Sequence, residues 1–234
     1  MFDVAFTVYD KHTMPKEAIT VLLRDVQDFP RARSYALKTD TPEVWSVLGQ
    51  YLVQAGEVHD GIESLIKAKS ADFVTEVTAA AEKTNQYGDL IRYLTMARAN
   101  SKSKDSKIDT ALVLTYAKTG RLGELEDFLK QTHNVKIGGI ADKCFADGLY
   151  ESARVLYSVA NNHAQVARTE IKLHNLPAAV DAANKAKSIE TYKEVNMACI
   201  EAGEMKLASV CAVPVLLKAE EMNGLCNRYE TRGL

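Results

Sequence analysis

Apolar residues recur along this chain at helical spacing, and turn residues interrupt them at regular intervals. In one pair of neighbouring segments the apolar positions follow i, i+3 and i+4 spacing, which lines one face of an α-helix. No stretch of useful length alternates with period two, so the sequence predicts no strands. The pattern therefore predicts an all-α fold. The two example stripes are Phe73, Val74, Val77 and Ala80, and then Leu90, Ile91, Leu94 and Ala97.

A turn residue recurs at the same place in this pattern about every 28 residues. Gly and Asn adopt left-handed backbone at low cost, so each of these anchors is expected to end one helix before the next begins. A period of this size with one helix break inside it predicts a solenoid of stacked helix pairs, an α-zigzag or α-α superhelix. The anchors, at spacings of 29, 35, 28, 27 and 28 residues, are Gly56, Asn85, Gly120, Gly148, Asn175 and Gly203.

Caps and breakers give the expected helix boundaries. Thr41 is the expected N-cap before Pro42, Ser106 and Asp109 fit a capping box, and Pro214 is expected to end a helix. The polar stretch at 100–107 is predicted to be a solvated loop, with a partner or phosphorylation site as the alternative. The predicted helices cover about 42–55, 58–69, 71–83, 87–99, 108–118, 122–131, a segment ending near 147, 149–160, 164–173, 176–186 (with Asn175 as N-cap), 189–202, 205–212 and 216–229.

The positions that follow each anchor identify the expected core. Five residues after every anchor stands an apolar or small residue, where a return helix should meet its partner. Four residues later the same face is apolar again in the first four repeats. The chain is predicted to be a single helical-repeat array over 1–234, with a partial repeat at about 1–40 and repeats over about 41–234. The core positions are Gly61, Leu90, Leu125, Ala153, Val180 and Ala208, and then Leu65, Leu94, Leu129 and Tyr157.

Composition narrows the class of function. The 234 residues include 29 basic and 31 acidic side chains, for a net charge of -2. This balance lacks the basic excess of a nucleic-acid surface. No apolar run is long enough to span a membrane, and the N-terminus does not read as a signal peptide. Four separated cysteines are expected to be buried thiols in a reducing compartment, which predicts a cytoplasmic location: Cys144, Cys199, Cys211 and Cys226.

The sequence carries no recognisable catalytic, cofactor or metal motif. Neither Gly120-x-x-Gly123 nor Gly138-Gly139 fits a phosphate-binding loop. The histidines stand alone, without a His-Glu-x-x-His pair or zinc-type cysteine spacing. We therefore expect a non-enzyme with no catalytic, cofactor-binding or metal residues and no cofactor. The five histidines are His12, His59, His133, His163 and His174.

The segment from Leu112 to Leu129 resembles the leg of the clathrin heavy chain, which carries an Ala-Lys-Thr-x-Arg-Leu-x-Glu-Leu-Glu-x-Phe pattern. Further segments resemble that leg in the same order over nearly the whole chain, although many single positions differ. The chain is therefore identified as a divergent member of that family, similar to the proximal leg. The other matching segments are Ala5–Tyr9, Pro42–Ser46, Ala141–Phe145, Tyr150–Tyr157, Ala178–Ala186, Thr191–Val195 and Tyr229–Gly233.

The resemblance implies a structural role in the clathrin coat of pits and vesicles, in intracellular protein transport and endocytosis. It implies lateral contacts with other heavy chains, a light chain as a candidate partner towards the C-terminal end, and membrane contact only through adaptors. The family's N-terminal propeller and C-terminal trimerisation segment are not found here, so the isolated chain is expected to be a monomeric fragment. The family's histidines have been proposed as pH sensors. No contact residue transfers to a position of this sequence.

Two alternatives come from other classes. Trp45, Leu48, Gly49 and Tyr51 nearly reproduce the start of a tetratricopeptide motif, which would make the chain a peptide-binding scaffold. The tyrosine comes one residue early, and no other repeat has the tryptophan. An all-helical enzyme would need convergent carboxylates. The pairs at Glu124 with Glu126 and at 220–221 instead have the spacing of solvated helix faces.

Overall fold

The computed structural model describes residues 2–100, 105–131 and 135–216, with side chains from residue 4 onward. Over these residues the chain forms fifteen α-helices, one π-helical segment and no strand, as the sequence predicts. The helices fall into two compact units. The first comprises Met1–Thr119 with His133–Val135, and the second Gly120–Thr132 with Lys136–Leu234. No helix within the described part is long and apolar enough to cross a membrane.

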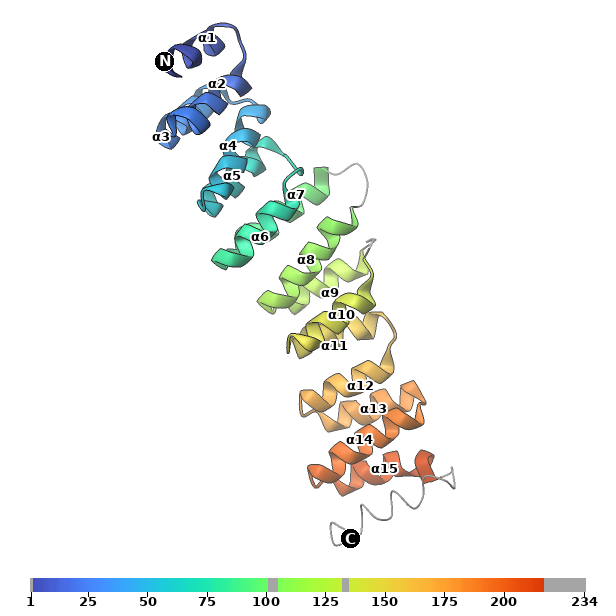
Figure 1. The fold of residues 1–234 in the computed structure, drawn as a ribbon. Coiled ribbons are helices and arrows are strands. Elements are labelled where there is room, and N and C mark those ends of the chain that lie inside the picture. The colour runs from blue at the N-terminus through green and yellow to red at the C-terminus, as the bar shows by residue number, and fades with distance from the viewer. Residues whose placement is uncertain (1, 101–104, 132–134, 217–234) are drawn as a thin grey trace. The chain divides into compact units, whose positions relative to one another are not determined.

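The first unit contains the helices up to α8, joined by short turns (Figure 1). Helices that follow one another pack together, most extensively α4 with α5. Helices two apart also touch, since α2 contacts α4, α4 contacts α6, α6 contacts α8, and α5 contacts α7. The unit is therefore a stack in which each helix pair packs on the next. Its elements are α1 (Phe2–Lys11), α2 (Pro15–Val21), the π-helical η1 (Leu22–Val26), α3 (Phe29–Thr39), α4 (Pro42–Gln54), α5 (Val58–Ala68), α6 (Val74–Thr84), α7 (Tyr87–Asn100) and α8 (Ser106–Thr119).

The second unit repeats this arrangement. Consecutive helices from α10 onward pack in sequence, while α9 packs on α11, α12 on α14 and α13 on α15. Buried alanines, valines and cysteines from α12 to α15 form a continuous core in this unit. Its helices are α9 (Leu122–Lys130), α10 (Ile137–Ala146), α11 (Tyr150–Val159), α12 (His163–Lys172), α13 (Leu176–Ala186), α14 (Ile189–Glu201) and α15 (Met205–Leu216).

The repeating turns have the left-handed residue that the sequence predicts at five of six anchors: Gly56, Asn85, Gly120, Gly148 and Gly203 all have positive φ. At four of these five, all except Gly120, the next residue donates its N–H to the carbonyl five residues before it, for example Leu149 to Cys144 at 2.8 Å and Glu204 to Cys199 at 2.8 Å. This pattern is the Schellman motif, which satisfies carbonyls at the helix end.

One anchor is wrong by a residue. His174 takes the left-handed conformation with φ 58°, whereas Asn175 has φ -100° and stands at the N-cap of α13. The Asn175 N–H donates to the carbonyl of Glu170 at 2.9 Å, in the place of the residue after the left-handed one. The turn therefore has the same backbone geometry as the others, although a histidine rather than Gly or Asn adopts the left-handed conformation.

The predicted core positions are buried. All six residues placed five after an anchor are inaccessible or nearly so, and Leu65, Leu94, Leu129 and Tyr157 are at most 7% exposed. Gly61 shows why small residues occur in this set. A Cβ there would lie 2.6 Å from Val53 Cγ2 and 2.9 Å from the Val53 backbone nitrogen, so α5 crosses α4 at close range.

Several helix ends differ from the sequence prediction. Helix α6 begins at Val74 rather than near 71, after a turn in which Ser70 donates to Asp72 at 3.2 Å. The capping box is wrong, because Asp105 accepts the Lys107 N–H at 2.9 Å and the Asp109 carboxylate is buried. Thr41 stands at the N-cap of α4 as expected, but its hydroxyl accepts no capping bond.

Pro214 does not end a helix. It lies inside α15, which continues to Leu216. Cys211, Ala212 and Val215 are buried in the core around it, so packing holds the last turn in place. The proline ring removes one helical hydrogen bond to the carbonyl of Val210, a residue whose side chain is exposed to solvent. Of the final predicted helix, 216–229, the residues from 217 lie outside the described residues, as does Cys226.

Candidate interaction surface

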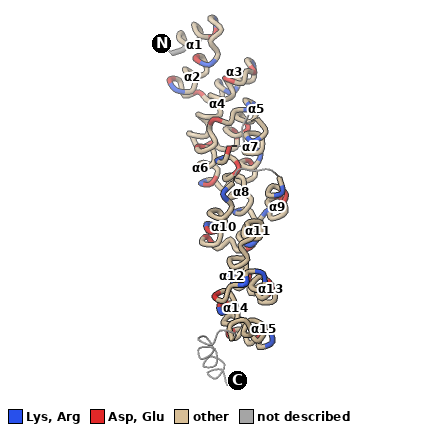
Figure 2. The backbone as a smooth tube through the Cα atoms, turned by 90° about the vertical axis from the view of Figure 1, so that its right-hand side faces the viewer, with Lys and Arg blue, Asp and Glu red and all other residues tan. Residues whose placement is uncertain are grey.

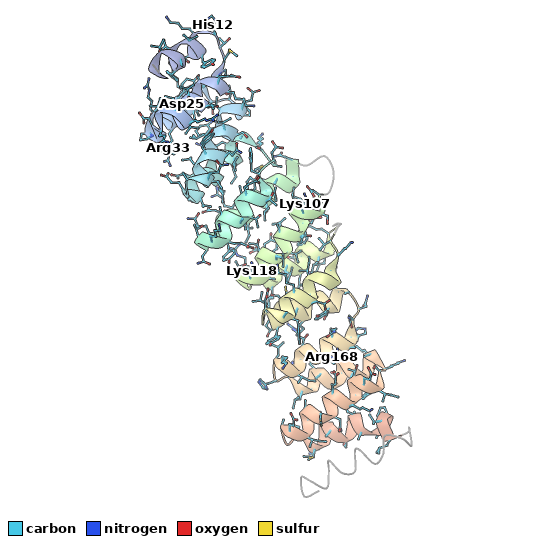
Figure 3. The ribbon with its side chains drawn as sticks, viewed as in Figure 1. His12, Asp25, Arg33, Lys107, Lys118 and Arg168 are labelled. Atoms are coloured by element: carbon cyan, nitrogen blue, oxygen red, sulfur yellow. The ribbon has the colours of Figure 1, made fainter. Side chains whose placement is uncertain are left out.

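Ion pairs join helices that are one repeat apart along the first unit. Arg33 of α3 reaches Glu57 at the start of α5 at 2.6 Å and also contacts Asp60. Arg92 of α7 then contacts Glu63 of α5. Because each pair joins one helix pair to the next, we call this set the interhelix ladder. Figure 3 labels Arg33, its first member.

The ladder continues between α6, α7 and α8. Lys118 near the end of α8 lies 2.7 Å from Glu82 of α6. Arg98 of α7 lies 3.0 Å from Asp109 of α8, with the aspartate side chain 1% exposed. A charge buried this deeply is stable only with a close partner, so this pair ties the two helices together at the end where residues 101–104 connect them.

The second unit uses the same device. Arg168 of α12 holds Glu194 of α14 with two hydrogen bonds of 2.6 and 2.7 Å. This two-pronged contact is the favoured geometry of an arginine–carboxylate pair. Tyr157 of α11 donates to Asp142 of α10 at 2.6 Å. Burial raises the pKa of the Glu170 carboxyl, and Arg154 at 3.9 Å opposes that rise.

These contacts fix how successive helix pairs stack and which charges are paired within the chain. Where these contacts join helices one repeat apart, the paired side chains are 24 to 36 residues apart in the sequence, so these pairs fix the register of one helix pair on the next. They also pair many of the charges within the chain. Basic and acidic residues are intermixed along both units rather than segregated (Figure 2). Such a surface favours many weak contacts over one strong electrostatic one.

The ladder is not apparent from the charges within any single helix, because its partners lie on different helices. Opposite charges at a separation near 28 residues are the signal that identifies them in a chain of this kind.

His59 is the histidine with a defined partner. Its Nδ1 lies 2.8 Å from Asp89 Oδ2 of α7, and the side chain is exposed. The hydrogen bond and charge of Asp89 raise the pKa of His59, with Asp60 and Glu63 on its own helix adding to the effect. The contact between α5 and α7 is therefore strengthened by protonation.

We expect the pair of His59 and Asp89 to make the stability of the first unit depend slightly on pH. Because the folded pKa of His59 is raised, its contribution is fully present below the unfolded pKa of about 6.5 and is lost as pH rises through the folded pKa. An NMR titration of the His59 ring should give a pKa above the usual histidine value of about 6.5. His59→Gln should remove this part of the pH dependence of unfolding. A His59 pKa at or below about 6.5 would contradict the assignment.

Other candidate chemistry does not converge in the described residues. They contain no group of three His, Cys, Asp or Glu side chains that could hold a metal. Cys144, Cys199 and Cys211 are buried thiols, as predicted. Glu124 pairs with Arg121 within its own helix at 3.2 Å. His12 and His174 are exposed, His163 is half-buried, and His133 lies outside the described residues, as does the 220–221 pair.

Trp45 serves packing rather than peptide capture. It is 6% exposed, its Nε1 donates to Asp40 at 2.8 Å, and Lys67 of α5 lies over its ring at 4.3 Å. Leu48 is fully buried, and a Cβ on Gly49 would lie 2.7 Å from Leu65. The tetratricopeptide-like residues are therefore the contact between α4 and α5.

Comparison with known proteins agrees with this architecture. Residues 65–207 match the clathrin family model described as the region in clathrin and VPS. The chain belongs to the clathrin heavy-chain family. Among its relatives, the clathrin heavy chain of Dictyostelium discoideum is 40% identical over 233 residues, covering 100% of this chain and 14% of the relative. The clathrin heavy chain of Drosophila melanogaster is 38% identical and human clathrin heavy chain 2 is 37% identical, with the same coverage.

Family membership decides between the clathrin and the tetratricopeptide interpretations of the sequence. The clathrin resemblance of Leu112–Leu129 is confirmed and extends over the whole chain, in place of the tetratricopeptide alternative. The chain spans 14% of the length of the curated clathrin heavy chains it matches.

Proposed function

We propose that this chain is a segment of a clathrin heavy-chain leg that helps to form the lattice of coated pits and vesicles, in intracellular protein transport and endocytosis. The observation that carries the proposal is the match of 233 of its 234 residues to clathrin heavy chains, at 34% to 40% identity among those compared. The segment is non-catalytic, requires no cofactor, and corresponds to the proximal leg. Its role is to supply shape and lateral surface.

The proposed mechanism is mechanical. Each helix pair buries its apolar face only against its neighbours, so stiffness comes from nearest-neighbour contacts. The ladder adds directional contacts at these junctions and resists sliding of one pair on the next. Many weak lateral contacts with other heavy chains then sum to a stable coat through multivalency, while each contact alone stays reversible.

The proposal includes partners and location. The partners are other clathrin heavy chains, with a light chain as a candidate towards the C-terminal end. The chain binds no nucleic acid and meets membrane only through adaptors, on the cytoplasmic face of coated pits and vesicles. Residues 1–234 form a single helical-repeat array, with a partial repeat at about 1–40 and repeats over about 41–234, because anchors at a spacing of 27 or 28 residues continue past Gly120.

A chimera tests the coat function. The aligned residues of the Dictyostelium heavy chain are replaced by residues 1–234 of this chain, and purified chimera is assayed for cage assembly by sedimentation and electron microscopy. We expect closed cages. A chimera that folds and trimerises but forms none would contradict the proposal, and circular dichroism of the same preparation separates this outcome from misfolding.

We also expect the isolated chain to be a monomer at micromolar concentration. Its proposed lateral contacts are individually weak and become strong only in a multivalent lattice. Analytical ultracentrifugation over a concentration series is the measurement. A tight oligomer at micromolar concentration would show that one surface of the isolated chain is a strong interface.

A further inference from the structure

The end of α12 carries a buried carboxylate with weak ionic support. The Glu170 side chain is 6% exposed, and 3.9 Å separates its Oε1 from Nε of Arg154 on α11. The same guanidinium lies closer to Glu151 of its own helix, at 3.2 Å. A buried charge is stable only with a close partner, so Glu170 depends on further contacts in its ionised form.

The helices packed on α12 bring one more negative charge and one neutral donor to Glu170. On the α11 side, Glu151 adds a negative charge, whereas at the start of α13 the Asn175 side chain forms a hydrogen bond with the Glu170 carboxyl. Helix α14 also packs on α12, but its Glu194 is held by Arg168 through bonds of 2.6 and 2.7 Å. Burial raises the pKa of Glu170, and the α11 guanidinium and the Asn175 bond oppose that rise.

Asn175 occupies the N-cap of α13 without capping it. Its backbone has φ -100° and ψ 72°, and its side chain accepts no hydrogen bond from the first turn. Asn162 stands at the same place in α12 with φ -89° and ψ 73°, and its Oδ1 accepts the N–H of Gln165 at 3.3 Å. The two asparagines have nearly the same backbone conformation. Asn175 is therefore in position to cap α13, but its side chain is engaged with Glu170 instead.

Pro177 limits the capping partner of Asn175 to one group. An N-cap side chain accepts from the N–H of the second or third helical residue. Pro177 is the second residue of α13 and has no N–H. Ala178 is the third, in the place that Gln165 holds in α12. The Asn175 side chain therefore has two alternative partners, the Glu170 carboxylate and the Ala178 N–H.

We propose that Glu170 and Asn175 form a proton-dependent switch at the junction of α12 and α13. With Glu170 ionised, the Asn175 amide donates to the carboxylate, and α13 begins without a side-chain cap. When Glu170 takes up a proton from water, this bond loses its charge assistance. The Asn175 side chain then turns to accept the Ala178 N–H and caps α13. Arg154 keeps Glu151 as its partner, so protonation leaves no guanidinium unpaired.

The switch makes the start of α13 more stable in acid. Because the folded pKa of Glu170 is raised, its protonation favours the folded chain. This contribution is fully present below the unfolded pKa of about 4.5 and is lost as pH rises through the folded pKa.

An NMR titration of the whole chain tests the switch. It uses the variant His174→Asn, which removes the exposed histidine of the same turn and suits the left-handed backbone there. The Ala178 amide should titrate with the midpoint of the Glu170 carboxyl carbon, and its hydrogen exchange, corrected for the intrinsic rate, should slow about fivefold as Glu170 is protonated. The Gln165 amide, which Asn162 caps, is the internal control and should not follow.

Three further variants separate a switch from a merely structural contact. Glu170→Met should keep the Ala178 amide protected at pH 7 and remove its pH dependence. Asn175→Ala should raise the midpoint of Glu170, because a bond to the ionised form is lost, and should abolish the response of Ala178. Asn162→Ala, the matched change at the cap of α12, should leave both unchanged. Circular dichroism confirms that the variants fold. An Ala178 amide that does not follow Glu170, or that still follows it in Asn175→Ala, would overturn the proposal.

Discussion

Gly61→Ala should lower the free energy of unfolding of the first unit by about 2 kcal/mol. The added Cβ would lie 2.6 Å from Val53 Cγ2, 2.9 Å from the Val53 backbone nitrogen and 3.1 Å from the Gly49 carbonyl oxygen. A side chain can rotate away, but two of these three atoms belong to the α4 backbone. Helices α4 and α5 must therefore separate, and their contact is the most extensive in the chain. This loss exceeds the gain of about 1 kcal/mol that alanine brings to a helix interior.

Gly88→Ala is the matched control for this prediction. Gly88 lies in α7, and a Cβ there would meet nothing within 4 Å. The same substitution should stabilise the chain by up to about 1 kcal/mol, because only the helix propensity changes. Urea unfolding of both variants, with hydrogen exchange resolved to α4 and α5, measures the difference. Equal effects of the two substitutions would mean that α4 and α5 do not approach closely at Gly61.

The features that sequence predicts well here are those set by nearby residues. Helix spacing, the left-handed Gly56 and Gly203, and the burial of Leu90 and Leu125 all follow from residues within one helix pair. The resemblance of Leu112–Leu129 adds the family, which periodicity alone does not supply. Sequence rules for helix ends and caps are less reliable where tertiary packing opposes them.

Pro214 and Asp109 illustrate that competition. The proline rule predicts a helix end, but buried neighbours on both sides of Pro214 keep α15 continuous. The capping-box rule assigns Asp109 to its own helix, but Arg98 of the preceding helix holds its carboxylate. At His174 the turn keeps its left-handed residue although histidine is unusual there. The preference of this position for Gly or Asn therefore placed the anchor one residue late, at Asn175.

The candidate surface is less predictable for a physical reason. His59 with Asp89 and Arg168 with Glu194 are pairs that exist only once the register of successive helix pairs is known. A hollow such as the one between α6 and α8 depends in the same way on two helices that are not adjacent in the sequence. Their side chains are ordinary in composition, and only the stacking brings them together.

Asp109→Ala should cost about 3 kcal/mol of stability, the largest effect expected from a charged residue here. The Asp109 side chain is 1% exposed and the Arg98 side chain 24% exposed, with 3.0 Å between Arg98 Nε and Asp109 Oδ1. Removing the carboxylate leaves a partly buried guanidinium without this partner and a cavity beside it. The aspartate also lies in the first turn of α8, where a negative charge is favourable.

Two comparisons isolate the effect of burial. Asp127→Ala removes an ion pair of similar length, 2.9 Å to Lys130, whose side chains are 74% and 72% exposed. It should change stability by no more than about 0.5 kcal/mol, because water screens an exposed pair. The double variant Arg98→Met/Asp109→Leu should recover most of the loss, since an apolar pair of similar volume leaves no charge buried. Urea unfolding of the three variants gives the values. If Asp109→Ala lowered the free energy of unfolding no more than Asp127→Ala, the ion pair with Arg98 would not stabilise the fold. The contact between α7 and α8 would then rest on apolar packing alone.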